Sequence, residues 1–91
     1  MKTVWKFEIP IVDEFTLHMP WYARVRHAGL DPSGAPCIWA EVDPEQPLEA
    51  KRFAIVGTGN PLPDHGDPWH VGSFVLGPFV WHLYSLVGGG A

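Results

Sequence analysis

Apolar and polar residues alternate with a period of two along most of the chain, a pattern typical of half-buried β-strands. The alternation covers residues 5–11, 15–19, 22–30, 36–42 and 50–58. Within residues 22–30 it places Ala23, Val25 and His27 on one face. Residues 69–84 form one long strand or two, because Gly77-Pro78 implies a bulge, a bend or a short reversal. We therefore predict about six strands, without any long helix.

The predicted strands are separated by segments rich in turn residues. Asp31-Pro32-Ser33-Gly34 has proline second and glycine fourth, so it predicts a β-turn and an antiparallel hairpin between residues 22–30 and 36–42. Ten prolines and ten glycines spread through the chain further disfavour helices. We expect an all-β fold of about six antiparallel strands, in a small sandwich or a partly closed barrel. Residues 1–87 would form this single domain, followed by a flexible Gly-rich tail at 88–91.

Two predicted strands carry large apolar side chains on both faces. Ile38 and Trp39 lie on opposite faces of one strand, and Trp81 and Tyr84 on opposite faces of the last. A single sheet with one face in water cannot bury both sets. Either both faces are covered within the monomer or one face meets another copy. We expect the second, a homodimer or higher homo-oligomer whose contact involves Trp39 or Trp81.

Composition narrows the classes of partner. A chain of 91 residues forms one domain, and a formal net charge of −4 with only six lysines and arginines argues against a nucleic acid polymer. The single cysteine, Cys37, excludes an intrachain disulfide and lies beside apolar Ile38, as expected for a packed thiol. Because no apolar leader and no uninterrupted membrane-length span is present, we expect a cytoplasmic protein without membrane contacts.

The segment from Gly57 to Asn60, Gly-Thr-Gly-Asn, joins an apolar strand to an extended arm with two prolines. Glycines permit close backbone approach, so successive N–H groups can point into one concavity and hold an anion or a sugar edge. The same residues also suit an ordinary tight turn. The segment is not a Walker loop, because no Lys-Ser or Lys-Thr follows, and Pro61 blocks the helix that a dinucleotide fingerprint requires.

Several residues have the chemistry to bind a nucleotide. Tryptophans stack on bases, a carboxamide pairs with a base or ribose edge, and arginines clamp phosphates. The predicted ligand-binding residues are Arg26, Trp39, Arg52, Gly57, Thr58, Gly59, Asn60 and Trp69. If the Gly-Thr-Gly-Asn turn is only a turn, we expect the site to lie instead across the oligomer interface, beside Trp81 and His82.

The five histidines form no recognised catalytic or metal pattern. Residues 64–70 hold two carboxylates and two imidazoles, but their spacing matches no established ligand set, and none of the five histidines begins a His-x-Ser or His-x-Thr pair. We therefore predict no catalytic residues, no metal and no cofactor. In the alternative in which the protein is an enzyme, His65 or His70 would act as the acid or base.

Four segments resemble a family of small uncharacterised proteins of bacteriophages and some bacteria. The resemblance runs from residue 4 to about residue 84. It rests on Trp5-Lys6-Phe7, on residues 36–43, on Arg52-Phe53-Ala54-Ile55-Val56-Gly57-Thr58-Gly59-Asn60-Pro61 and on Gly77-Pro78-Phe79-Val80-Trp81-His82. It implies a compact protein made in an infected bacterial host, and it assigns no activity.

Several small β-rich phage proteins of other families sequester the nucleotide signals of host immunity, and this chain is similar to them in size and composition. We therefore hypothesise a non-enzymatic protein that binds and sequesters a small nucleotide signal, such as a cyclic ADP-ribose derivative, and so inhibits antiphage defence. The alternative is a structural or protein-binding module with no small-molecule ligand, in which the tryptophans form a protein interface.

Overall fold

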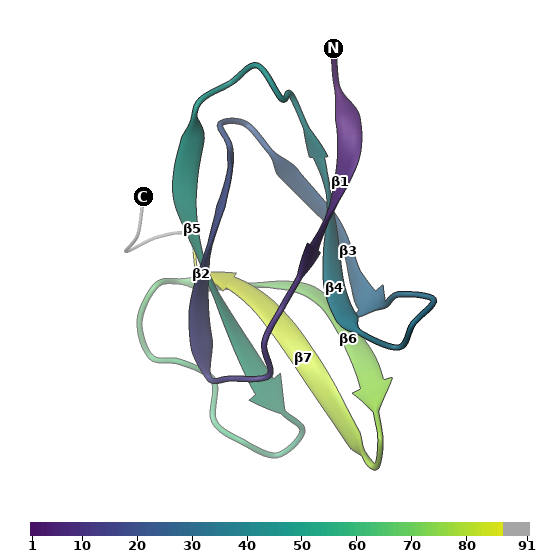
Figure 1. Ribbon diagram of the computed structural model, residues 1–91. Coiled ribbons are helices and arrows are strands. Elements are labelled where there is room, and N and C mark those ends of the chain that lie inside the picture. The colour runs from purple at the N-terminus through teal and green to yellow at the C-terminus, as the bar shows by residue number, and fades with distance from the viewer. Residues whose placement is uncertain (87–91) are drawn as a thin grey trace.

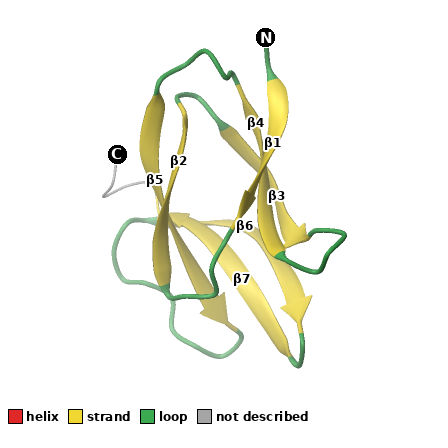
Figure 2. Ribbon diagram, in the orientation of Figure 1, coloured by secondary structure: helices red, strands yellow, loops and turns green. Residues whose placement is uncertain are grey.

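The computed structural model describes residues 1–86, which form seven antiparallel strands and no helix (Figures 1 and 2). The strands are β1 (Thr3–Glu8), β2 (Glu14–Pro20), β3 (Arg24–Leu30), β4 (Pro36–Val42), β5 (Leu48–Gly57), β6 (Pro68–Leu76) and β7 (Phe79–Leu86). The predicted all-β fold is confirmed. The predicted tail at 88–91 lies outside the described residues. Residues 1–86 contain no helix long and apolar enough to cross a membrane.

The strands form two sheets, ordered β1-β4-β3 and β2-β5-β7-β6. Every neighbouring pair is antiparallel. The two sheets approach each other most closely where β3 runs beside β6 (Figure 1). At this place a Cβ on Gly72 would lie 3.4 Å from the Cβ of Ala28, in ordinary van der Waals contact. The result is a sandwich that is joined along one side and is not a closed barrel.

The core lies between the two sheets and is built by the alternating residues that face inward. Phe53, Met19, Ile38 and Leu83 are its largest fully buried side chains. Burying an apolar side chain of this kind stabilises the fold by about 1.5–3 kcal/mol. The stacked rings of Phe15 and Phe53, 5.5 Å apart between centroids, join β2 to β5 inside this core. The period-two pattern is therefore the main determinant of the fold.

Two tight turns fix the register of the hairpins. The Asp31–Gly34 turn forms as predicted, with the Gly34 amide donating to the Asp31 carbonyl at 2.8 Å. Gly77 and Pro78 form a two-residue turn in which Gly77 has φ = 60°, the conformation of the first central residue of a type II′ turn. Residues 68–86 therefore form two strands, which settles the choice that the sequence left open.

A β-bulge between Val25 and His27 changes the predicted faces of β3. Val25 lies opposite Ala40 and packs on the core, whereas His27 lies opposite Trp39 on the outer face. The prediction that His27 shares a face with Val25 is wrong, because the extra residue at the bulge, Arg26, shifts the alternation by one position.

The outer face of β5 and β7 is covered from within the monomer. Ala54, Val56 and Leu86 point away from the core yet are buried. The segment that follows β5 returns over this face, and a Cβ on Gly66 would lie only 2.9 Å from that of Leu86. The apolar outer positions of this sheet thus have a cover in the same chain, which weakens the argument from apolar faces for self-association.

Candidate functional site

The Gly-Thr-Gly-Asn segment lies at an open edge of the four-stranded sheet. β2 begins at Glu14, opposite Ala54, and the last contact of this edge is the Ile55 amide donating to the Asp13 carbonyl at 3.0 Å. Beyond that point β5 continues to Gly57, paired with β7 along one edge and, within residues 1–86, with no strand along the other. Because backbone groups alternate along a strand, the Gly57 N–H points to the same open edge as that of Ile55.

Gly57 has no side chain, so the side chains of Asn60 and Trp81 can pack closely against the backbone at this edge. A Cβ on Gly57 would lie 3.1 Å from Nδ2 of Asn60 and 3.2 Å from Cζ3 of Trp81. Any larger residue would push the carboxamide or the indole away. The close approach predicted for this glycine is therefore present, and it brings together a hydrogen-bonding group and an aromatic ring.

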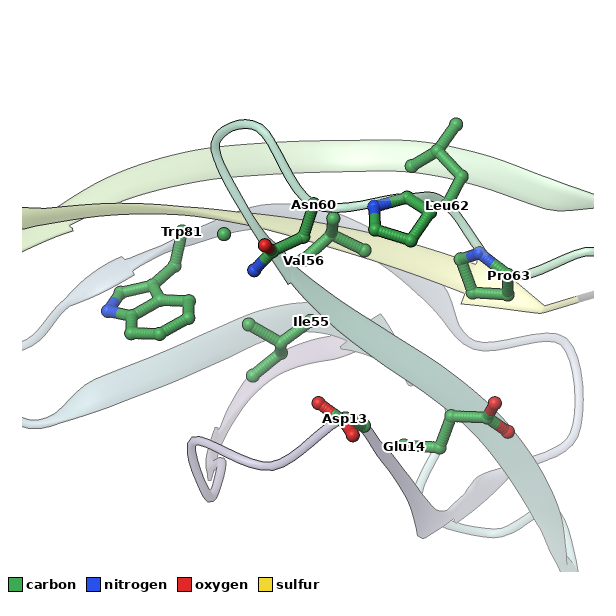
Figure 3. Close-up of a pocket in the computed structure, with 10 residues that line it drawn as sticks. Asp13, Glu14, Ile55, Val56, Asn60, Leu62, Pro63 and Trp81 are labelled. Carbon is green, nitrogen blue, oxygen red and sulfur yellow. The ribbon is translucent and has the colours of Figure 1, made fainter.

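These groups line a groove of about 360 Å³, here called the edge groove (Figure 3). Its walls are Asp13, Glu14, Ile55, Val56, Gly57, Asn60, Pro61, Leu62, Pro63 and Trp81. Figure 3 shows Trp81 at one end and Glu14 at the other, with Ile55 and Asp13 between them. The volume lies in the range of small-molecule sites.

At the Glu14 end of the edge groove, an arginine and a histidine both contact the Glu14 carboxylate. One Glu14 oxygen accepts from Arg52 at 2.6 Å, and the other lies 2.9 Å from Nε2 of His65. The hydrogen bond to Glu14, with a further contribution from Asp64, raises the pKa of His65 above its usual value. Arg52 therefore reaches a ligand only by sharing or leaving Glu14.

The turn itself does not form a continuous cradle of N–H groups. The Thr58 amide donates to the Val80 carbonyl at 3.3 Å, and the Asn60 amide donates to the Gly57 carbonyl at 3.0 Å. Gly59 has φ = 94°, as a tight turn requires. The segment is thus an ordinary tight turn, the alternative that the sequence left open, and not a cradle of successive amides, because the Thr58 amide bonds to β7 and the Asn60 amide closes the turn.

The remaining predicted residues lie apart from the edge groove. Arg26 is held by Glu41 on the three-stranded sheet, at 2.8 Å. Trp39 is on the same sheet, with its ring 5.6 Å from that of His27. Trp69 is 70% exposed and lines a different cavity of about 330 Å³. The structure thus brings together Gly57 and Asn60, with Arg52 at the far end of the groove, and it separates Arg26, Trp39 and Trp69 from them.

Thr58 belongs to a second arrangement that the sequence did not reveal, here called the outer-face relay. It consists of Thr58, His82, Ser73 and His70, which cross from the end of β5 over β7 to β6. Nε2 of His82 lies 2.7 Å from Oγ1 of Thr58, and Nδ1 lies 2.6 Å from Oγ of Ser73. His70 Nε2 contacts the same serine oxygen at 3.2 Å. Beside His82 is a hollow of about 230 Å³ that Thr58, Gly59, Asn60 and Tyr84 help to line.

Neither the histidines nor the cysteine forms a metal centre in residues 1–86. No group of three or more His, Cys, Asp or Glu side chains converges there. His65 and His70, neighbours in the sequence, contact Glu14 and Ser73 respectively. Cys37 is buried, and this burial raises the pKa of its thiol, so it is a packed thiol as predicted.

Comparisons with known proteins agree with the resemblance only at the level of a family. No curated protein and no solved structure matches the chain. One family model, described as a domain of unknown function, DUF7352, matches residues 1–89, nearly the whole sequence. The chain therefore belongs to the DUF7352 family.

Proposed function

We propose that this protein binds a small nucleotide in the edge groove and sequesters it unchanged. The observation that carries the proposal is the convergence of Trp81, Asn60 and Asp13 on one groove, with Arg52 and His65 held by Glu14 beside its far end. An indole offers a stacking surface, a carboxamide both donates and accepts, and a carboxylate accepts from base N–H groups.

The groove has a polarity that suits a nucleotide lying along it. The base would lie between Trp81 and Asp13, where the carboxylate favours a base with adjacent N–H donors. The phosphate would lie toward Arg52 and His65, competing with Glu14 for their N–H groups. Because the net charge is −4, long-range attraction does not draw an anion to the protein. Affinity would come from these short contacts.

The resemblance to small phage proteins gives the proposal its setting. In an infected bacterium, a protein that holds an immune nucleotide signal lowers its free concentration and so inhibits the defence. Such a protein requires affinity and abundance, not turnover.

The test is to identify what the protein retains. Purified protein would be mixed with nucleoside mono- and diphosphates, cyclic dinucleotides and cyclic ADP-ribose, freed of unbound material, denatured and analysed by mass spectrometry. An intact nucleotide released in stoichiometric amount supports sequestration. A chemically altered nucleotide supports an enzyme instead, and an empty protein overturns the proposal.

Matched variants place a retained nucleotide in the groove. Asn60→Ala and Arg52→Ala should each raise the dissociation constant about tenfold, which corresponds to one hydrogen-bonded contact. Arg26→Ala is the control, because Arg26 is also an exposed arginine paired with a glutamate, but on the other sheet. If both groove variants bind within twofold of the wild type, the ligand lies elsewhere.

A second candidate function is a protein-binding module, favoured by the turn between β2 and β3. There Tyr22 is 73% exposed and has φ = 68°, an unfavourable conformation for a residue with a side chain, and its ring meets that of Trp21 edge-on. The partner would be another protein or a second copy of this chain, as a homodimer. Light scattering at tens of micromolar tests the dimer, and Tyr22→Gly should break the contact while relieving the backbone strain.

A further inference from the structure

One arrangement of protons satisfies every contact of the outer-face relay. In it the Thr58 hydroxyl donates to the Val80 carbonyl, 3.4 Å from Oγ1. The threonine oxygen then accepts from Nε2–H of His82 at 2.7 Å. A neutral imidazole carries one proton, so in this arrangement Nδ1 of His82 is the unprotonated nitrogen.

Ser73 supplies the proton that this nitrogen accepts. Its Oγ lies 2.6 Å from Nδ1 of His82, and Nε2–H of His70 donates to the same oxygen from 3.2 Å. The serine hydroxyl is therefore hydrogen-bonded to a base whose tautomer and orientation are set by a third group, Thr58. This is the relation of nucleophile, base and orienting group that activates serine in hydrolases. Ser73 is also exposed, so a substrate can reach it.

We propose that Ser73 is an activated nucleophile with His82 as its general base, and that it hydrolyses small activated carboxylic esters. Thr58 is a positioning residue that acts through His82. The acyl group would enter beside His82 through the hollow of about 230 Å³, whose walls include Leu62 and Tyr84.

The reaction balances with water alone. Oγ of Ser73 bonds to the ester carbonyl carbon as its proton passes to Nδ1 of His82. The bond between that carbon and the leaving alkoxide then breaks, and His82 gives the proton to the alkoxide. Water then attacks the acyl-serine and gives a proton to His82, and the serine leaves as an alkoxide that takes this proton back. The net change is one ester and one water converted to one acid and one alcohol.

This activity does not depend on nucleotide binding. The edge groove and the hollow beside His82 share Val56, Gly57, Asn60 and Leu62, but the reacting groups, Ser73 and His82, do not line the edge groove. An inactive serine leaves nucleotide retention untouched, and failure to retain a nucleotide leaves the serine reactive. The two proposals therefore fail separately.

The experiment uses a fluorophosphonate probe, which a nucleophilic serine attacks with loss of fluoride, followed by intact-mass and peptide analysis. We expect one adduct, located on Ser73, and none in Ser73→Ala. His82→Gln should slow labelling by about 100-fold or more, the usual contribution of a general base. Thr58→Val should slow it about tenfold and Thr58→Ser should restore it, with circular dichroism unchanged in both.

Ser85→Ala is the matched control, since Ser85 lies on β7 outside the relay and should leave labelling unchanged. Hydrolysis of 4-nitrophenyl acetate would follow the same order of variants. Labelling of the folded protein no faster than of the urea-unfolded chain would overturn the proposal. So would an adduct that persists in Ser73→Ala, or equal rates in Thr58→Val and the wild type.

Discussion

The turns at Asp31–Gly34 and at Gly57–Asn60 both reverse the chain after a strand, and they use their polar groups in opposite ways. The Asp31 carboxylate is buried and accepts from the Ser33 amide and hydroxyl, the Ala35 amide and the Lys6 ammonium, all at 2.6–2.9 Å. Asn60 in the second turn is exposed and faces the edge groove with its carboxamide.

The difference separates a turn that holds the fold together from one that presents a site. A buried carboxylate that accepts four hydrogen bonds within the fold is not presented to a ligand, and its loss leaves those donors without an acceptor. An exposed carboxamide contributes little to stability and keeps its hydrogen-bonding capacity for a partner. Four matched changes test this contrast.

Asp31→Ala should have the largest effect on stability. It removes the acceptor of two backbone amides, one hydroxyl and the Lys6 ammonium, which no neighbouring group can replace. We expect the urea midpoint to fall further than for any other variant discussed below. Ser33→Ala removes only one of these contacts and should lower the midpoint much less. Equal effects of the two would mean that the carboxylate is not the centre of the turn.

The same carboxylate should make the fold sensitive to acid. The hydrogen bond from Lys6, then those from Ser33 and Ala35, hold the pKa of Asp31 far below its usual range. A group whose pKa is lowered by folding stabilises the protein above its unfolded pKa of about 4, and this stabilisation is lost as the pH falls toward the folded value. Thermal unfolding of Asp31→Asn should thus depend less on pH between about 5 and 2 than that of the wild type. Parallel pH curves would contradict this.

The fold could be predicted from the sequence because its determinants are local. Alternation predicted that Ile38 and Trp39 lie on opposite faces of β4, and the Asp31–Gly34 turn predicted one hairpin. The predicted face of His27 was wrong because the period-two pattern does not reveal the bulge between Val25 and His27. The edge groove was found in part, since Gly57 and Asn60 signal a close approach, but Trp81 reaches them only through the β5–β7 pairing.

The outer-face relay was missed for a reason that the Gly77-Pro78 turn makes clear. A two-residue turn at these positions sets Ser73 directly opposite His82 when residues are counted outward from it. If residues 69–84 formed one long strand, as the sequence analysis allowed, Ser73 and His82 would not be paired. Had Gly77-Pro78 been read as a type II′ turn, the serine and the histidine would have been predicted as cross-strand neighbours.

Substitutions of the two turn glycines, Gly34 and Gly59, test whether the two turns have equivalent backbones. Gly34 and Gly59 have φ of 87° and 94°, and a Cβ at either position meets nothing within 4 Å. Gly34→Ala and Gly59→Ala should therefore each destabilise the protein by about 1 kcal/mol, the cost of a left-handed conformation for a residue with a Cβ. Denaturant unfolding of both variants checks this. A clear difference between them would show that the backbones are not equivalent and that one turn relaxes.

Asn60→Ala should have the smallest effect on stability and the clearest effect on binding. The side chain is exposed, and the turn is closed by the Asn60 amide, which alanine keeps, so the free energy of unfolding should change by no more than about 0.5 kcal/mol. Loss of the carboxamide removes a base- or ribose-pairing group from the edge groove, so a retained nucleotide should dissociate about tenfold more readily.

The decisive comparison is with Asp31→Ala, measured at a temperature where that variant is still folded. Because Asp31 lies in the β3–β4 turn of the three-stranded sheet, its loss should lower stability yet leave the affinity of the folded fraction unchanged. If Asn60→Ala instead destabilised the fold while binding held, the second turn would be structural in the same way as the first, and the groove would lose its principal polar group.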